Sequence, residues 1–118
     1  GVYVAERLGL RAIVVADLAL AAFAGACVGL VPKAGARASV EDGKLAPNLA
    51  ENVAEMVNIM AALFNLDGHP HVRLDGFHLP GEDLPADVAR LSAAYVNRLD
   101  LVVTISGYGT GRLSIVLA

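Results

Sequence analysis

The chain has little of what several protein classes need. Its 118 residues include one cysteine and no tryptophan, and only 18% of them are charged. The single cysteine, Cys27, has no partner for an internal disulfide and no Cys or His at the spacing of a metal site, which argues against a disulfide scaffold and a zinc module. Within its Ala-rich segment, Cys27 is expected to be a small, buried hydrophobic residue.

Basic charge is also scarce. The formal net charge is −3, and the nine Lys and Arg residues form no cluster. Proteins that bind nucleic acids need a basic stripe that displaces counterions from the phosphates, so we expect no nucleic-acid partner. The length predicts a single domain over residues 1–118. Because the first residue is Gly1 rather than Met, we expect this domain to lack an N-terminal segment.

A long apolar run, Ala12 to Val31, raises the question of a membrane span. Asp17 interrupts this run, and a charge in the middle of a span is costly. Asp17 is better explained as the N-cap of a helix that follows a short buried strand, Ala12 to Val15. No secretory signal pattern is visible. We therefore expect a cytoplasmic protein with no membrane partner.

The rest of the chain alternates between strand and helix patterns. An exposed turn over 6–9 joins the first two strands, and Pro47 suits the first turn of the longest helix. A stripe of Val88, Leu91 and Tyr95 marks the last helix. This order predicts an α/β (α+β) domain with one mixed sheet covered by helices. The expected strands are 2–5, 12–15, 71–77, 101–105 and 113–117; the expected helices are 17–30, 49–65 and 85–98; and 33–44 is expected to be a polar loop.

Two other patterns have structural interpretations. The glycines between Gly107 and Gly111 resemble a phosphate-binding loop in composition, but a strand follows them instead of a helix. A hairpin turn that uses Gly for positive φ is therefore expected. His69, His71 and His78 lie close in sequence without a third placed ligand, so they are interpreted as surface histidines rather than a metal site.

The segment from Leu49 to Asn65 has the strongest helical period. Its large apolar residues recur at i, i+4, i+7 and i+8, which defines one buried face. At about 100° per residue, Glu51, Glu55 and Asn58 fall on the opposite face, and Ala62 continues it before Asn65. The apolar face comprises Leu49, Val53, Met56, Val57, Met60, Leu63 and Phe64.

Glu55 and Asn58 stand out on the polar face. Residues three apart on a helix are neighbours, so this carboxylate and this amide can address one target together. The alternative is an ordinary solvated helix surface. Asn is a poor residue for a helix interior, because its side chain competes for backbone hydrogen bonds. At least one of Asn52 and Asn58 is therefore expected to serve another purpose.

The pair Glu55-x-x-Asn58 on an amphipathic helix resembles the E-x-x-N signature of the CheC/CheX chemotaxis phosphatases, which remove phosphate from response-regulator receiver domains. The resemblance spans roughly Ala12 to Phe64 and includes the first helix, an acidic linker at Glu41–Gly43 and the motif helix. It implies a CheC/CheX-like fold. It also implies that Glu55 grips the partner's active site and that Asn58 orients the attacking water.

Two places depart from the family pattern. The family often has a Gly-Asn pair soon after the motif Asn, where this chain has Ala62-Leu63, and it has Asp or Ser four residues before the motif Glu, where this chain has Glu51. Ala62 keeps a small side chain, whereas Leu63 loses the amide. We expect Glu51 and Ala62 to contact the partner.

Two functions follow from these residues. The first is a phosphatase that acts on the aspartyl-phosphate of a receiver domain and needs no cofactor of its own, because the magnesium ion belongs to the receiver. The second is a non-catalytic signalling or scaffold module of the same fold, favoured by Ala62-Leu63 and the extra helix over 85–98. The high apolar content, 56%, also indicates a homodimer, which is compatible with either function.

Overall fold

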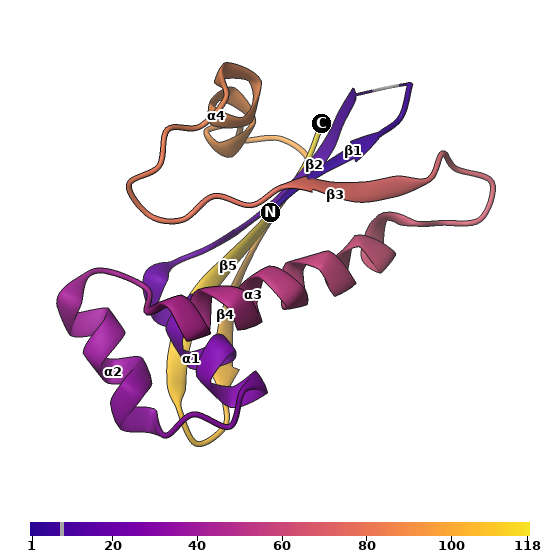
Figure 1. Ribbon diagram of the computed structural model, residues 1–118. Coiled ribbons are helices and arrows are strands. Elements are labelled where there is room, and N and C mark those ends of the chain that lie inside the picture. Colours follow the sequence, from indigo (N-terminus) through magenta and orange to yellow (C-terminus); the bar gives the residue numbers. More distant parts are fainter. Residues whose placement is uncertain (8) are drawn as a thin grey trace.

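The computed structural model describes residues 1–7 and 9–118, and its strands build one sheet (Figure 1). The strands are β1 (Val2–Ala5), β2 (Gly9–Ala16), β3 (Val72–Gly76), β4 (Arg98–Ile105) and β5 (Gly109–Leu117). Their order is β3-β1-β2-β5-β4, and all four neighbouring pairs are antiparallel. The predicted mixed sheet is therefore wrong. Each of the hairpins β1–β2 and β4–β5 reverses the chain, and β2–β5 and β1–β3 also pair in opposite directions.

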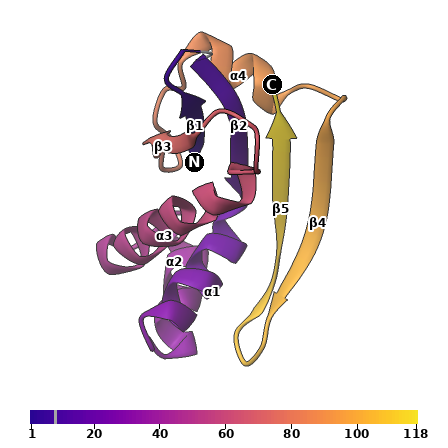
Figure 2. The ribbon, with the colours of Figure 1, turned by 90° about the vertical axis from the view of Figure 1, so that its right-hand side faces the viewer.

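The helices complete an α+β architecture. They are α1 (Leu18–Val28), α2 (Lys33–Asp42), α3 (Pro47–Ile59), the 3₁₀ helix η1 (Met60–Phe64) and α4 (Ala86–Ser92). On one face of the sheet, Tyr3 and Val14 pack with Met60 and Phe64. On the other face, Ile13 and the neighbouring apolar residues pack with Val88 of α4. The two figures show α1, α2 and α3 grouped together and α4 apart from them (Figures 1 and 2).

The first helix begins as predicted. The Asp17 carboxylate accepts a hydrogen bond from the Leu20 amide (2.8 Å), which is an N-cap interaction. Ala22 and Ala26 are buried, as the packed Ala-rich helix requires, but Cys27 is exposed. The expectation of a core cysteine is wrong, because Cys27 lies at the end of α1, where Val28, Gly29 and Leu30 are exposed as well. No helix in the described part of the chain combines the length and hydropathy needed to cross a bilayer.

The segment predicted as a polar loop is a helix, α2. Pro32 precedes its first residue, and Gly43 closes it in the left-handed conformation (φ 68°) that glycine adopts easily. Buried Ala36 and Ser39 hold the helix against its neighbours, and the Ser39 hydroxyl accepts a hydrogen bond from the Ala46 amide (3.0 Å). The amphipathic pattern of α2 is hard to recognise in the sequence, because the segment is short and contains several charged residues and Gly35. Glu41 and Asp42, predicted as a linker, form its last turn.

The last helix is shorter than predicted. It ends at Ser92, and the residues up to Asn97 form a turn before β4. The Arg98 guanidinium donates to the carbonyls of Ser92 (2.9 Å) and Ala94 (3.1 Å), which satisfies backbone groups at the end of the helix. Val88 is buried as predicted, but Tyr95 is 97% exposed because it lies beyond the helix.

Both predicted hairpins are present. In the first, Glu6 and Arg7 lie in the turn and Gly9, with φ 67°, begins β2, while Leu8 lies outside the described residues. In the second, Gly107 supplies the positive φ (81°) that the hairpin needs. The other glycines of this loop have a different role, because a Cβ on Gly111 would lie 2.5 Å from the Leu20 backbone nitrogen of α1. The Gly-rich sequence therefore allows α1 to pack closely on β5.

Candidate functional site

The inner face of the motif helix packs against α1 and α2, and one hydrogen bond joins it to β1. Leu49, Val53 and Val57 are buried, and the Tyr3 hydroxyl donates to the Val57 carbonyl (2.5 Å) from β1. Burial raises the pKa of Tyr3 to about 12, since the phenolate would lose its hydration. Pro47 occupies the first turn, as predicted. The orientation of α3 is therefore fixed, and its outer face points away from the core.

Glu51, Glu55 and Asn58 are exposed on that outer face. Both Glu55 and Asn58 lie within the α-helical part of the segment, so their side chains start about 5 to 6 Å apart at Cβ. A carboxylate accepts hydrogen bonds and pairs with cations, whereas an amide both donates and accepts. The two groups can therefore bind a cationic group and orient a water molecule on the same approaching surface.

The polar residues of this segment divide into two groups. The Asn52 amide donates to the Gly25 carbonyl of α1 (2.9 Å). The Asn65 side chain donates to the Val72 carbonyl (2.9 Å) and accepts from the Val72 amide (2.7 Å), which joins the end of η1 to β3. Asn52 and Asn65 are structural residues, and Asn52 is the mid-helix asparagine with another purpose.

In contrast, no hydrogen bond or ion pair within residues 1–7 and 9–118 uses the side chains of Glu51, Glu55 or Asn58. Asn58 is a poor helix former by propensity, and the structure gives it no internal role in compensation. The Glu55–Asn58 pair is therefore available to a partner.

The segment changes its winding directly after Asn58. The α-helix ends at Ile59 and continues as the tighter η1, which turns each residue by about 120° instead of 100°. Ala62 is exposed, as predicted. Leu63, predicted to be buried, is 57% exposed, and the residues of η1 that pack against the core are instead Met60, Ala61 and Phe64.

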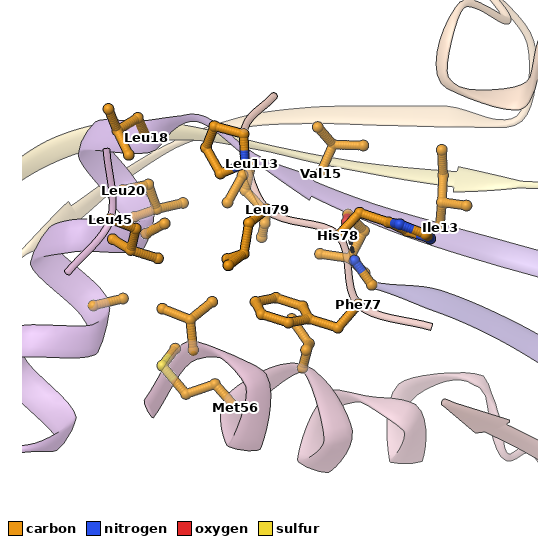
Figure 3. A pocket seen from close by; sticks show the side chains of 18 of the residues that line it. Ile13, Val15, Leu18, Leu20, Leu45, Met56, Phe77, His78, Leu79 and Leu113 are labelled. Carbon is orange, nitrogen blue, oxygen red and sulfur yellow. Dashed lines mark hydrogen bonds between the residues drawn. The ribbon is translucent and has the colours of Figure 1, made fainter. Parts of the chain in front are cut away.

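The inner face of α3 borders an apolar cavity of about 670 Å³ (Figure 3). In Figure 3, Met56 of α3 faces Leu79 and Phe77 of the segment before α4 across this space. Leu20 and Leu45 lie at the left-hand end of the cavity in Figure 3. Cavities of this size and lining accept apolar groups. Sequence reasoning missed it, because Phe77 and Leu79, which line it, belong to no periodic pattern in the sequence.

Few polar groups border this cavity. His78 is partly buried at its edge, with Nδ1 3.9 Å from a Glu82 carboxylate oxygen, and that carboxylate accepts a hydrogen bond from the Leu79 amide (3.0 Å). His69 and His71 are exposed, as predicted for surface histidines. In the part of the chain that the structure describes, no three His, Cys, Asp or Glu side chains gather as metal ligands would.

A second polar cluster lies on β4 and β5. Asp100 accepts hydrogen bonds from the Ser114 hydroxyl (2.5 Å) and from Arg98 Nε (2.9 Å). The Ser114 hydrogen bond, followed by the Arg98 bond and charge, lowers the pKa of Asp100. Arg98 also closes the end of α4. The hydrogen bonds of these three side chains are therefore made with one another on the exposed surface of the β4–β5 pair.

Comparison of the chain with protein-family models, curated proteins and solved structures finds no match. The functional interpretation therefore depends on the residues of the α3 surface and their chemistry.

Proposed function

We propose that the protein is a phosphatase for the aspartyl-phosphate of a response-regulator receiver domain, with a CheC/CheX-like fold. The observation that carries the proposal is the exposed Glu55–Asn58 pair, which no hydrogen bond among the described residues uses, on a helix in which the Asn52 amide is bound to the Gly25 carbonyl. The E-x-x-N spacing of this pair is the spacing that the CheC/CheX resemblance implies for catalysis.

The hydrolysis requires few chemical groups from the phosphatase. An aspartyl-phosphate is an acyl phosphate, and its hydrolysis needs a water molecule in line with the bond to the leaving carboxylate. Asn58 holds this water through its amide, and Glu55 pairs with a cation in the receiver's site. Glu51, one turn before Glu55, and Ala62, one turn after Asn58, contact the receiver on either side. The magnesium ion is part of the receiver's site.

The test is a dephosphorylation time course with candidate receiver domains. Wild type is compared with Glu55→Ala and Asn58→Ala, and Asn48→Ala is the control, because Asn48 is an exposed asparagine in the first turn of the same helix. We expect Asn58→Ala to lower the accelerated rate by about 100-fold or more, since it removes a positioned hydrogen-bonding group. Unchanged acceleration in Asn58→Ala would remove that residue from the mechanism.

A non-catalytic binding module is the second candidate. Leu63 replaces the amide that the family often has, and its side chain is exposed. Under this candidate, wild type binds a receiver domain without shortening the lifetime of its phosphate. A binding titration run beside the time course separates the two candidates.

A further inference from the structure

The apolar cavity on the inner side of α3 has a closed end and an open end (Figure 3). Leu20 and Leu45, at the left-hand end in Figure 3, are only 4% and 6% exposed, so solvent barely reaches this end. Val15 and Leu84 line the same cavity and are 43% and 42% exposed. In Figure 3, Val15 and His78 lie to the right of the two buried leucines. The cavity therefore runs from a closed inner end to an open mouth.

The walls of the cavity are fixed by contacts that do not depend on any ligand. The Asn52 amide joins α3 to the Gly25 carbonyl of α1 (2.9 Å), and the Tyr3 hydroxyl joins β1 to the Val57 carbonyl of α3 (2.5 Å). These bonds hold the helices and the sheet at a set separation. A cavity that exists before the ligand arrives reduces the entropy that binding costs.

The cover of the cavity is the segment 77–85, which connects β3 to α4. It has no helix or strand, and it contributes Phe77 and Leu79 to the lining. A turn closes it locally, because the Glu82 amide donates to the Leu79 carbonyl (3.2 Å) and the Glu82 carboxylate accepts from the Leu79 amide (3.0 Å). Irregular, exposed segments open at the lowest free energy, so a ligand enters when this segment alone moves.

Polar side chains are confined to one part of the lining. They are His78, Glu82 and Ser92, and the Ser92 hydroxyl already donates to the Ala89 carbonyl (2.7 Å). The His78 and Glu82 side chains are 26% and 50% exposed, with Nδ1 3.9 Å from a carboxylate oxygen. The ligand therefore places an apolar tail at the closed end and a polar head beside His78 and Glu82.

The charge at the mouth defines the polar head. The Glu82 carboxylate accepts hydrogen bonds and repels an anion, whereas the His78 imidazole can donate or accept. A neutral head that both donates and accepts, such as a hydroxyl or an amide, satisfies both residues. A carboxylate or phosphate head would place a second negative charge beside Glu82.

The volume of the cavity defines the apolar tail. Its 670 Å³ is several times the volume of about 150 Å³ that is enough for benzene. An α-helix about 10 Å in diameter would fill this volume with fewer than two turns, which is too little for a partner helix to dock. A flexible aliphatic chain of about ten carbons fits and leaves room for its head group.

We propose that the cavity binds a neutral amphiphile, which is an aliphatic chain with a hydroxyl or amide head. The chain extends toward Leu20 and Leu45, and the head hydrogen-bonds with His78 and Glu82. This binding site does not depend on the proposed phosphatase activity, which concerns the outer face of α3.

The experiment measures displacement of the neutral dye N-phenyl-1-naphthylamine, whose fluorescence rises in apolar surroundings, from the protein. Decan-1-ol is expected to displace the dye with a stoichiometry of one molecule per chain. Octan-1-ol should bind about 10-fold more weakly, because two fewer CH₂ groups are buried. Decanoate should also bind about 10-fold more weakly or worse, because its charge faces Glu82.

Substitutions inside the cavity locate the site. Met56→Trp adds bulk from α3 and Leu79→Trp adds it from the cover, and each is expected to weaken decan-1-ol binding by about 10-fold or more. Ile59→Trp is the matched control, because it places the same side chain on the same helix at a position that is 68% exposed. Circular dichroism checks that each variant folds. Leu79 lies outside helices and strands, so Leu79→Trp keeps the test valid if Met56→Trp does not fold.

Four results would overturn the proposal. They are a folded wild type that binds neither dye nor decan-1-ol, wild-type affinity in folded cavity variants, decanoate binding as tight as that of decan-1-ol, and dye binding only at dilutions where light scattering shows a monomer. The last result would mean that a second copy fills the cavity. The dephosphorylation time course is a separate assay, so the failure of either proposal leaves the other standing.

Discussion

The Asn52 amide donates a hydrogen bond to the carbonyl of Gly25 (2.9 Å), at a point of close contact between α1 and α3. A Cβ on Gly25 would lie 2.8 Å from the Leu49 carbonyl oxygen, so glycine allows the two helices to meet there. This contact fixes the helix that carries the candidate site. It also shows that Asn52 and Asn58, which look alike in sequence, have different roles.

Replacement of Asn52 by Leu is expected to lower the free energy of unfolding by about 0.5 to 1.5 kcal/mol, because the hydrogen bond from Asn52 is lost and the Gly25 carbonyl keeps only the Gly29 amide as a donor. Replacement of Asn58 by Ala should change it by less than about 0.5 kcal/mol, since Asn58 is exposed. Urea denaturation of the two variants measures both values. Equal stability of the two variants would contradict the structural role of Asn52.

Gly111→Ala is expected to destabilise the protein by about 1 to 3 kcal/mol, because the added methyl would press on the Leu20 backbone of α1. Gly35→Ala is the control, since its Cβ meets only a methyl group of Val31 and alanine favours a helix. Thermal unfolding of the two variants checks this. If Gly111→Ala melts at the wild-type temperature, α1 does not pack on β5 as closely as described.

The burial of Tyr3 predicts that the free energy of unfolding falls at alkaline pH. Its folded pKa, about 12, lies above its ordinary value of 10.0, so the neutral form is the one that folding favours. Its contribution is therefore complete below pH 10 and is lost as the pH rises from 10 to 12. Tyr3→Phe should lower stability at neutral pH by about 1 to 2 kcal/mol, because the Val57 carbonyl loses its donor.

The measurement is the difference in unfolding free energy between wild type and Tyr3→Phe at several pH values. This difference should narrow between pH 10 and pH 12. The exposed Tyr95 provides the control, since Tyr95→Phe should show no such trend. A difference that stays constant over this pH range would contradict the buried, neutral Tyr3.

The free edge of β4 supports the proposed homodimer. β4 ends the sheet, and Leu99, Leu101 and Val102 are exposed (Figure 2). The Leu117 amide donates a hydrogen bond to the Asn97 carbonyl, which fixes the pairing pattern of β4 and β5. The backbone N–H and C=O groups of odd-numbered β4 residues therefore bond to β5. Those of even-numbered β4 residues point outward, to the free edge. An edge of this kind pairs readily with another strand, here that of a second copy.

Val102→Pro is expected to prevent the proposed dimer from forming, because it removes an N–H on the free edge and leaves the ladder with β5 intact. Val102→Thr keeps the N–H and should remain dimeric. Light scattering gives the mass of each variant. A monomeric wild type, or a dimeric Val102→Pro variant, would show that this edge does not join two copies.

The sequence predicted those elements whose signals are local. The cap at Asp17, the hairpin at Gly107 and the amphipathic α3 each depend on residues close in the chain. The helix α2 was missed, because its stability depends on the burial of Ala36 against other elements and not on its own weak pattern. Antiparallel pairing of the whole sheet likewise depends on partners distant in sequence.

The candidate site shows the same limit. The exposure of Glu55 and Asn58 followed from helical periodicity, which α3 obeys as far as Ile59. The exposure of Leu63 did not, since Met60, Ala61 and Phe64 are the residues of η1 that pack on the sheet, and this packing depends on strands distant in sequence. The hydrogen bonds of Asn52 and Asn65, which distinguish these two residues from Glu55 and Asn58, join residues that only the fold brings together.

The most direct test of the central claim is the rate constant of aspartyl-phosphate loss from a receiver domain held in saturating complex with wild type or Asn58→Ala. Saturation removes any difference in docking, so the rate reports on water positioning alone. The account predicts an accelerated rate for wild type and a rate close to that of the free receiver for Asn58→Ala. Equal rates for the two proteins would contradict it.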